Sequence, residues 1–192
     1  MNTPASSTTP YEIEIKLPAP DLAAIRERLR GREARLLSPP HFESNDLYDH
    51  PDGTLVKAGR VLRLRRTEDG ATLTFKGPAR FEDGAKTREE RETAVSDPNE
   101  MESILAALGF HRRFRYEKRR EEWALDDCVI ALDETPIGTF AEVEGDPAAI
   151  RRVVGHLGLD PSESLPYSYA ELYARRRRED PTLPVDMLLE GA

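Results

Sequence analysis

The short stretch Glu12-Ile13-Glu14-Ile15-Lys16 alternates charged and apolar residues. Such alternation is typical of a half-buried strand, because successive side chains point to opposite faces of a sheet. Two carboxylates on alternate residues lie roughly 6–7 Å apart along a strand. That spacing allows both to reach one metal ion, with a lysine beside them for an anionic ligand. Taken alone, the stretch would also suit a solvent-facing strand over an apolar core.

Pairs of like charges at alternate positions recur in other strand-like stretches, and single charges, namely Lys76, Arg88 and Asp133, accompany them. Like charges side by side on a sheet repel each other, and surface ion pairs contribute only about 0–1 kcal/mol each. A concave site for a polyanion explains the pattern better, since lysine and arginine hold phosphate oxygens while carboxylates hold Mg²⁺ or Mn²⁺. The residues concerned are Glu90, Glu92, Glu142, Glu144 and Asp133 on the acidic side, and Arg63, Arg65, Lys76, Arg88, Lys118 and Arg120 on the basic side.

The residue pattern predicts the elements that must position these charges. Pro39-Pro40 should interrupt the irregular strand expected over residues 33–50, and the composition of residues 49–53 predicts a turn. A Glu-x-Glu strand is followed three times by an aspartate that caps a helix, which predicts a largely antiparallel sheet with helices packed outside. The expected strands are 11–17, 33–50, 61–65, 72–76, 86–95, 111–125, 128–134 and 139–145, and the expected helices begin at Asp21, Asp97, Asp146 and Ser168.

The composition limits the kind of protein. The 192 residues suffice for one core, and the net charge of −8 disfavours general nucleic-acid binding. The single cysteine, Cys128, excludes an internal disulfide, and the four histidines lack the spacing of zinc ligands. Without a long apolar run or a leader pattern, we expect a cytoplasmic protein. Residues 1–10 should form a loose tail, 11–180 one domain, and 181–192 a second tail docked through Leu183 and Met187–Leu189.

These motifs, in this order, resemble the CYTH superfamily, also called the triphosphate tunnel metalloenzymes. The opening Glu-x-Glu-x-Lys stands at residues 12–16, and the Leu-Arg-x-Arg stretch at 62–65. The resemblance covers about residues 11–173 and continues through Leu73–Pro78, the Arg-x-Glu-x-Glu at 88–92, the Lys-x-Arg at 118–120, Asp133, Gly138–Glu144 and Ser168-Tyr169.

The resemblance implies an α+β fold, namely an eight-stranded antiparallel barrel that forms a tunnel with helices outside. It implies one or two Mg²⁺ or Mn²⁺ ions held by Glu12, Glu14, Glu142 and Glu144, with Asp133 and Glu92 as helpers. Glu90 is a further candidate for metal or water positioning, and Arg88 for a phosphate contact or for orienting Glu90. The implied triphosphate ligands are Lys16, Arg63, Arg65, Lys76, Lys118 and Arg120.

The resemblance implies chemistry on a small-molecule triphosphate, such as tripolyphosphate, thiamine triphosphate or ATP. Attack by water would make the chain a triphosphatase, whereas attack by the ribose 3′-hydroxyl of ATP would make it a class IV adenylyl cyclase. A cyclase must also hold a base and a sugar, and the sequence reveals no adenine pocket, so we favour hydrolysis of tripolyphosphate. The cyclase, a non-catalytic polyphosphate or nucleotide binder, and a structural domain with a solvated charged sheet stay open.

Overall fold

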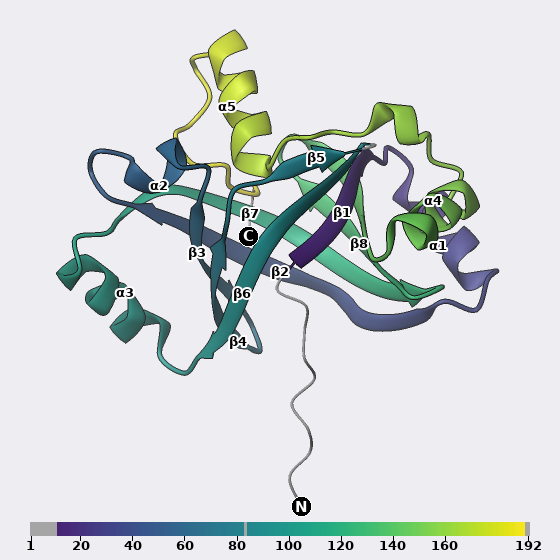
Figure 1. Cartoon of the computed structure of the whole chain (residues 1–192), viewed down its shortest axis with the longest axis horizontal. Coiled ribbons are helices and arrows are strands. Elements are labelled where there is room, and N and C mark those ends of the chain that lie inside the picture. The colour runs from purple at the N-terminus through teal and green to yellow at the C-terminus, as the bar shows by residue number, and fades with distance from the viewer. Residues whose placement is uncertain (1–10, 83, 191–192) are drawn as a thin grey trace, which may run out of the picture.

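The computed structural model describes residues 11–82 and 84–190, which form one antiparallel sheet with helices around it (Figure 1). The strands are β1 Tyr11–Pro18, β2 Arg35–Asp49, β3 Val61–Thr67, β4 Gly70–Lys76, β5 Arg80–Glu82, β6 Ala85–Val95, β7 His111–Leu125, β8 Cys128–Thr135 and β9 Gly138–Glu144. The helices are α1 Leu22–Arg30, α2 Thr54–Lys57, α3 Pro98–Ala107, α4 Pro147–His156, the 3₁₀ turn η1 Pro161–Glu163 and α5 Tyr169–Glu179.

Eight of the strands close into a barrel. Their order is β1-β9-β8-β7-β2-β3-β4-β6, and β6 pairs back onto β1 with Glu12 opposite Arg88. The short strand β5 pairs only with β6 and lies outside the ring. The closed α+β barrel confirms the predicted fold, and closure gives the polar faces of the strands a shared lumen.

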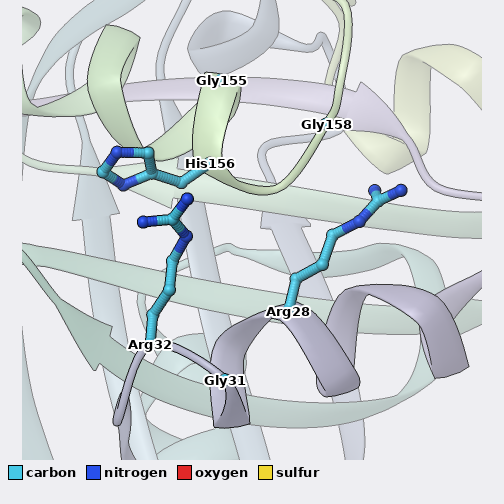
Figure 2. A pocket seen from close by; sticks show the side chains of 6 residues that line it. All are labelled: Arg28, Gly31, Arg32, Gly155, His156 and Gly158. Carbon is cyan, nitrogen blue, oxygen red and sulfur yellow. The ribbon is translucent and has the colours of Figure 1, made fainter.

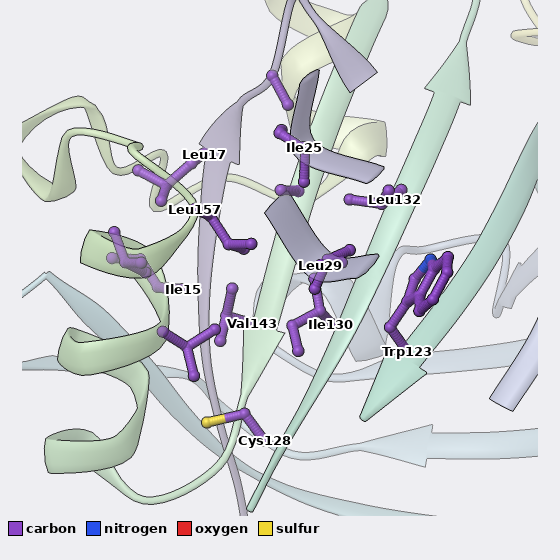
Figure 3. Packing of buried hydrophobic residues seen from close by; sticks show 14 of the residues in the cluster. Ile15, Leu17, Ile25, Leu29, Trp123, Cys128, Ile130, Leu132, Val143 and Leu157 are labelled. Carbon is purple, nitrogen blue, oxygen red and sulfur yellow. The ribbon is translucent and has the colours of Figure 1, made fainter. Parts of the chain in front are cut away.

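The main apolar core lies between the outer face of one side of the barrel and the helices α1 and α4. Ile15, Leu17, Ile130 and Val143 lie on the outward face of their strands and are buried under α1 and α4. Figure 3 shows these strand residues facing Leu29 and its neighbours from the two helices. Because β1 alternates strictly, burying Ile15 and Leu17 outside turns Glu12, Glu14 and Lys16 into the lumen.

Two smaller apolar clusters complete the packing. Leu105 of α3 packs with Tyr48 and Leu64 on the opposite side of the barrel. Tyr169 and Tyr173 of α5 pack with Met187 of the C-terminal segment. The backbone N–H of Met187 donates to the carbonyl of Arg115 on β7, and Leu183 packs against the same cluster. The predicted docking of the C-terminal segment is therefore present over residues 181–190.

The capping residues behave as their types predict. The carboxylates of Asp21, Asp97 and Asp146 each accept hydrogen bonds from the backbone at the starts of α1, α3 and α4. Asp97 caps α3 alone, by accepting from the backbone N–H groups of Asn99 and Glu100. A capping box forms instead at α5, between Ser168 and Glu171.

Other local predictions need correction. Pro39-Pro40 does not interrupt β2; the strand continues, and its pairing with β7 shifts register between Leu36 and His41. Prolines lack an N–H donor, so they distort the ladder without ending the strand. The sequence pattern missed β5 and α2, and the region expected as a turn after β2 leads into α2. The predicted N-terminal tail, residues 1–10, lies outside the described residues, as do 191–192.

Candidate functional site

Charged side chains from all eight barrel strands meet in the lumen as a ring of ion pairs. Lys16 on β1 lies 2.9 Å from Glu142 on β9, and Glu142 in turn contacts Arg120 on β7. Arg120 and Lys118 on β7 both pair with Asp133 on β8. Glu43 on β2 then pairs with Lys118 on β7 and with Arg65 on β3. Arg63, also on β3, pairs with Glu90 and Glu92 on β6. Lys76 on β4 closes the ring by pairing with Glu90 on β6 and with Glu12 on β1.

The deepest part of the ring is Lys118 with Asp133, whose side chains are 2% and 0% exposed. The Nζ of Lys118 lies 3.0 Å from Oδ2 of Asp133, and Arg120 donates to both carboxylate oxygens at 2.7 and 2.8 Å. Burial works against the ionised carboxylate, but Arg120 and Lys118 outweigh it and lower the pKa of Asp133. The carboxylate is therefore ionised and fully engaged with cations.

The acidic residues of β1 and β9 lie opposite each other. The register pairs Glu14 with Glu144 and Lys16 with Glu142. Directly opposed residues on antiparallel strands have Cβ atoms about 4.5–5.5 Å apart, so the two Glu-x-Glu motifs share one patch of the lumen. Lys86 of β6 contacts Glu14 from the neighbouring strand. The patch carries more carboxylates than cations.

Crowding among these carboxylates shifts their proton affinities in opposite directions. Burial opposes ionisation of Glu12, but a hydrogen bond with Glu90 and the charge of Lys76 lower the pKa of Glu12 to about 2. Burial and the same hydrogen bond raise the pKa of Glu90 to about 8. Burial and the charge of Glu12 raise the pKa of Glu144 to about 7. The patch thus holds protons near neutrality, which is what carboxylates do when they lie close enough to share a cation.

The donor chemistry of the lumen fits a divalent cation bound together with an anion. Carboxylate oxygens are the ligands that Mg²⁺ and Mn²⁺ prefer. Buried Nε donors of Arg63 and Arg65 have no hydrogen-bond partner among the described residues, although both arginines face the lumen. In the described chain no three His, Cys, Asp or Glu side chains already surround one point. Most of the lumen carboxylates, Glu14 and Glu142 among them, are instead turned toward a lysine or arginine.

The predicted site residues fall into two groups. All of the predicted acidic residues and the six predicted triphosphate ligands line the lumen. Arg88 differs, because its Nε donates to the carbonyl of Gly77 at 2.9 Å and its Nη2 to that of Gly59 at 3.3 Å. Burial lowers the pKa of Arg88 despite neighbouring carboxylates. Its contacts are with the loops before β3 and after β4.

Three lumen residues were missed by sequence reasoning, and a fourth, Tyr169, was noted only as part of the Ser168-Tyr169 motif without a role in the site. Glu43 and Asn45 alternate on β2, a signal hidden by the neighbouring prolines, and both are buried. Lys86 stands two residues before Arg88 and so faces the same way. Tyr169 comes from a helix, and its hydroxyl donates to Asp133 at 2.6 Å. Only the alternation on β2 and β6 could have revealed the first three.

Aromatic side chains fill one end of the lumen. Tyr116 and Phe140 each stand two residues before a lumen charge, and both pack against Tyr169 with ring centroids 6.1 and 5.4 Å away. Toward the other end the charged residues become accessible: Glu92 is 44% exposed and Glu144 is exposed.

A surface cleft of about 570 Å³ lies outside the barrel, where the C-terminal ends of α1 and α4 meet (Figure 2). Arg28 donates to the carbonyl of Leu157 there, and Figure 2 shows Arg32 beside His156. Cations at helix C-termini satisfy the last carbonyls and complement the helix dipole. We assign this cleft to helix capping.

Among the described helices, none has the length and apolar character needed to cross a membrane.

Comparisons with known proteins agree with this geometry. The CYTH domain model matches residues 10–153. The chain is 28% identical over 134 residues to a putative adenylate cyclase of Methanocaldococcus jannaschii, covering 69% of this chain and 75% of that protein. It also resembles the structure of a putative adenylate cyclase from Vibrio parahaemolyticus, with a TM-score of 0.76, 23% identity, and coverage of 87% of this chain and 99% of that one.

A third relative is a putative adenylyl cyclase from Hippeastrum, whose structure matches with a TM-score of 0.65 and 20% identity over 92% of this chain and 99% of that one. These structural matches concern the fold. The family model spans most of the chain, from the first Glu-x-Glu to α4. The chain therefore belongs to the CYTH domain family.

Proposed function

We propose that this chain is a divalent-metal-dependent phosphohydrolase that acts on triphosphate-bearing substrates, with inorganic tripolyphosphate as the favoured one. The observation that carries the proposal is the closed ring of ion pairs across all eight strands. Buried ion pairs are a weak source of stability, because the desolvation of two charges offsets most of their attraction. A ring of this size is better explained by a ligand that carries many charges of its own.

The cations would hold the phosphate oxygens. Lys16, Arg63, Arg65, Lys76, Lys118 and Arg120 now pair with lumen carboxylates. A triphosphate offers them stronger, bidentate acceptors, so the lysines and arginines would exchange partners. Exchange keeps each buried charge compensated before and after binding, and it fixes the chain of three phosphates along the lumen.

The carboxylates released by this exchange would hold the divalent cation. Glu12, Glu14, Glu142 and Glu144 are the proposed ligands, since they face one another across β1 and β9. When bound, Mg²⁺ or Mn²⁺ supplies charge neutralisation and orientation of the phosphate oxygens. Glu90 and Glu92, beside Lys76 and Arg63, are placed to orient the attacking water.

The proposed reaction is an in-line displacement at the terminal phosphorus. The oxygen of water forms a bond to that phosphorus, and the bond to the bridging oxygen breaks with its electrons going to the diphosphate. The products from tripolyphosphate are phosphate and diphosphate, and the two protons of water are shared between product and solvent. The protein contributes chiefly by positioning and by charge stabilisation, which dominate phosphoryl transfer.

An adenylyl cyclase is the second candidate, and the names of the relatives favour it. The ribose 3′-hydroxyl of ATP would then attack the α-phosphorus and release pyrophosphate. The Hippeastrum protein is described as having a dominant triphosphatase activity despite its cyclase name. A cyclase must also hold the adenine base, and the lumen-side aromatic rings of Tyr116, Phe140 and Tyr169 already pack against one another. We therefore put hydrolysis first.

The test is a product assay on the purified chain. Tripolyphosphate and ATP are incubated separately with Mg²⁺, with Mn²⁺ and with a chelator, while phosphate, pyrophosphate and cyclic AMP are followed together. The proposal predicts metal-dependent phosphate release from tripolyphosphate without cyclic AMP. Cyclic AMP with equimolar pyrophosphate from ATP would replace the hydrolase with the cyclase. Binding of tripolyphosphate without any product would favour a non-catalytic binder.

A further inference from the structure

Tyr169 is held in a defined position at the start of α5. The capping box fixes the helix start, with the N–H of Ser168 donating to Glu171 at 2.8 Å. The preceding loop is tied to the barrel, because the N–H of Leu165 donates to the carbonyl of Lys16 at 2.8 Å. Tyr169 is the first residue of α5 and is buried. The helix therefore delivers one phenol to the inner end of the lumen.

The hydroxyl of Tyr169 completes the contacts of Asp133. It donates to Oδ2 at 2.6 Å, beside Lys118 at 3.0 Å and two bonds from Arg120. Oδ2 thus receives three donors, from Lys118, Arg120 and Tyr169, whereas Oδ1 receives one, from the Nε of Arg120. Burial, then the charges of Asp133 and Glu142, raise the pKa of Tyr169 well above its ordinary value, so the phenol stays a donor.

The ring of Tyr169 covers a third cation. The Nζ of Lys16 lies 3.7 Å from the ring centroid, and that of Lys118 lies 5.3 Å away. An ammonium over an aromatic face is attracted by the ring quadrupole, more strongly where water is excluded. Lys16 is thus held between the ring of Tyr169 and the carboxylate of Glu142.

We propose that Tyr169 is a positioning residue for the phosphate-binding cations: its hydroxyl sets Lys118 and Arg120 through Asp133, and its ring sets Lys16. This inference rests on the proposed function. It also places Asp133 on the phosphate side of the site, because all four hydrogen bonds to this carboxylate come from the tyrosine and from two of the proposed phosphate-binding cations. The helix α5 thereby tunes affinity for the triphosphate without touching the metal ligands.

The test compares Tyr169→Phe with Tyr173→Phe. Tyr173 is a matched control: it lies on the same helix, is equally buried, and its hydroxyl donates to the carbonyls of Pro184 and Asp186 outside the lumen. Tyr169→Phe should raise the KM for tripolyphosphate about 10- to 150-fold, which is the usual effect of a lost hydrogen bond to a charged group. The half-saturating Mg²⁺ concentration should not change, and Tyr173→Phe should leave KM within about 2-fold of the wild type.

A double-mutant cycle with Asp133→Asn separates positioning from general destabilisation. Because the hydroxyl acts through Asp133, the KM effects of Tyr169→Phe and Asp133→Asn should be strongly non-additive. The thermal shift that each variant shows with tripolyphosphate, measured against its own melting temperature, gives an independent binding readout.

Three outcomes would overturn the proposal. They are equal KM values for the two tyrosine variants, additive effects in the cycle, or a higher Mg²⁺ requirement in Tyr169→Phe at unchanged KM. A wild-type chain that neither binds nor cleaves tripolyphosphate would instead overturn the proposed function, and this inference with it.

Discussion

Individual side chains in the lumen depend on partners that are remote in the sequence. Glu43 of β2 pairs with Arg65 of β3 and with Lys118 of β7, and it is 1% exposed. Burial opposes its ionisation, but Lys118, the nearby His41 ring and other cations lower the pKa of Glu43 well below its ordinary value. Removing one member of such a group leaves a buried charge uncompensated, at a cost of about 3–5 kcal/mol.

His41 should titrate above its ordinary pKa. Its Nε2 lies 3.7 Å from Oε1 of Glu43, and the contact with this carboxylate, opposed in part by burial, raises the pKa of His41 above its ordinary value of 6.5. A raised pKa in the folded state means that the protonated ring stabilises the fold. This stabilisation is complete below pH 6.5 and is lost as the pH rises through the folded-state pKa.

Two measurements check the His41 prediction. The midpoint of an NMR titration of the His41 ring should lie above that of an unfolded peptide. Between about pH 5.5 and about pH 8.5, the free energy of unfolding of the wild type should fall by more than that of His41→Asn. A midpoint at or below the peptide value, or an identical pH response in His41→Asn, would contradict the assigned contact with Glu43.

The alternation of charges predicted which residues share the lumen, but not their partners. Glu12, Glu14 and Lys16 were assigned to one face, and that face lines the lumen. The pairing of Glu14 opposite Glu144 depends on strand register, which no local pattern encodes. Tyr169 reaches Asp133 across 36 positions of sequence from a helix. Strand periodicity says nothing about such a contact.

The two faces of a barrel strand lie in different surroundings, one against the helices and one in the lumen. On β1, Ile15 and Leu17 are buried against α1 and α4, while Glu14 and Lys16 face the lumen. The apolar side therefore determines the orientation of the charged side, since a slip of one residue would exchange the two faces. Packing of α1 and α4 is what holds the site residues in place.

Leu29→Ala tests this packing. Leu29 of α1 is fully buried in the cluster shown in Figure 3, so its truncation should lower the free energy of unfolding by about 2–5 kcal/mol. Leu108→Ala is the control, because Leu108 is 63% exposed and should change stability by only about 0.5 kcal/mol. Urea unfolding of both variants is the measurement. Similar losses in the two would contradict the placement of α1.

Long periodic elements were predictable, whereas short ones were not. Seven of the barrel strands and four helices follow from period and capping residues. β5 has three residues and α2 has four, too few to show any period. β2 was expected to break at Pro39-Pro40, yet the flanking pairing with β7 carries the strand through. There the tertiary ladder outweighs the local preference of proline.

Charge compensation links the whole barrel to its proposed ligand. The net charge is −8, yet the lumen gathers cations from five strands and matches them with carboxylates. A triphosphate with a divalent cation brings both signs of charge, so it replaces the internal pairs without leaving charges unpaired. A ligand of a single sign would leave some of them buried and uncompensated.

Tripolyphosphate with Mg²⁺ should therefore stabilise the folded chain. At a ligand concentration about 100-fold above Kd, mass action adds about 2.7 kcal/mol, which corresponds to a rise in Tm of roughly 5–10 °C for a domain of this size. Orthophosphate with Mg²⁺ at equal concentration is the control and should give a much smaller shift. Equal shifts by thermal denaturation would indicate nonspecific anion binding and contradict the account of the lumen.

The most direct test compares turnover of tripolyphosphate by Glu142→Gln and Glu134→Gln. Glu142 faces the lumen beside Lys16, whereas Glu134 is on the outer face of β8 and pairs with Arg26. If the lumen carboxylates hold the metal, Glu142→Gln should lose at least about 100-fold in kcat while still binding tripolyphosphate, and Glu134→Gln should match the wild type. Near-wild-type turnover by Glu142→Gln would contradict the proposal that hydrolysis occurs in the lumen.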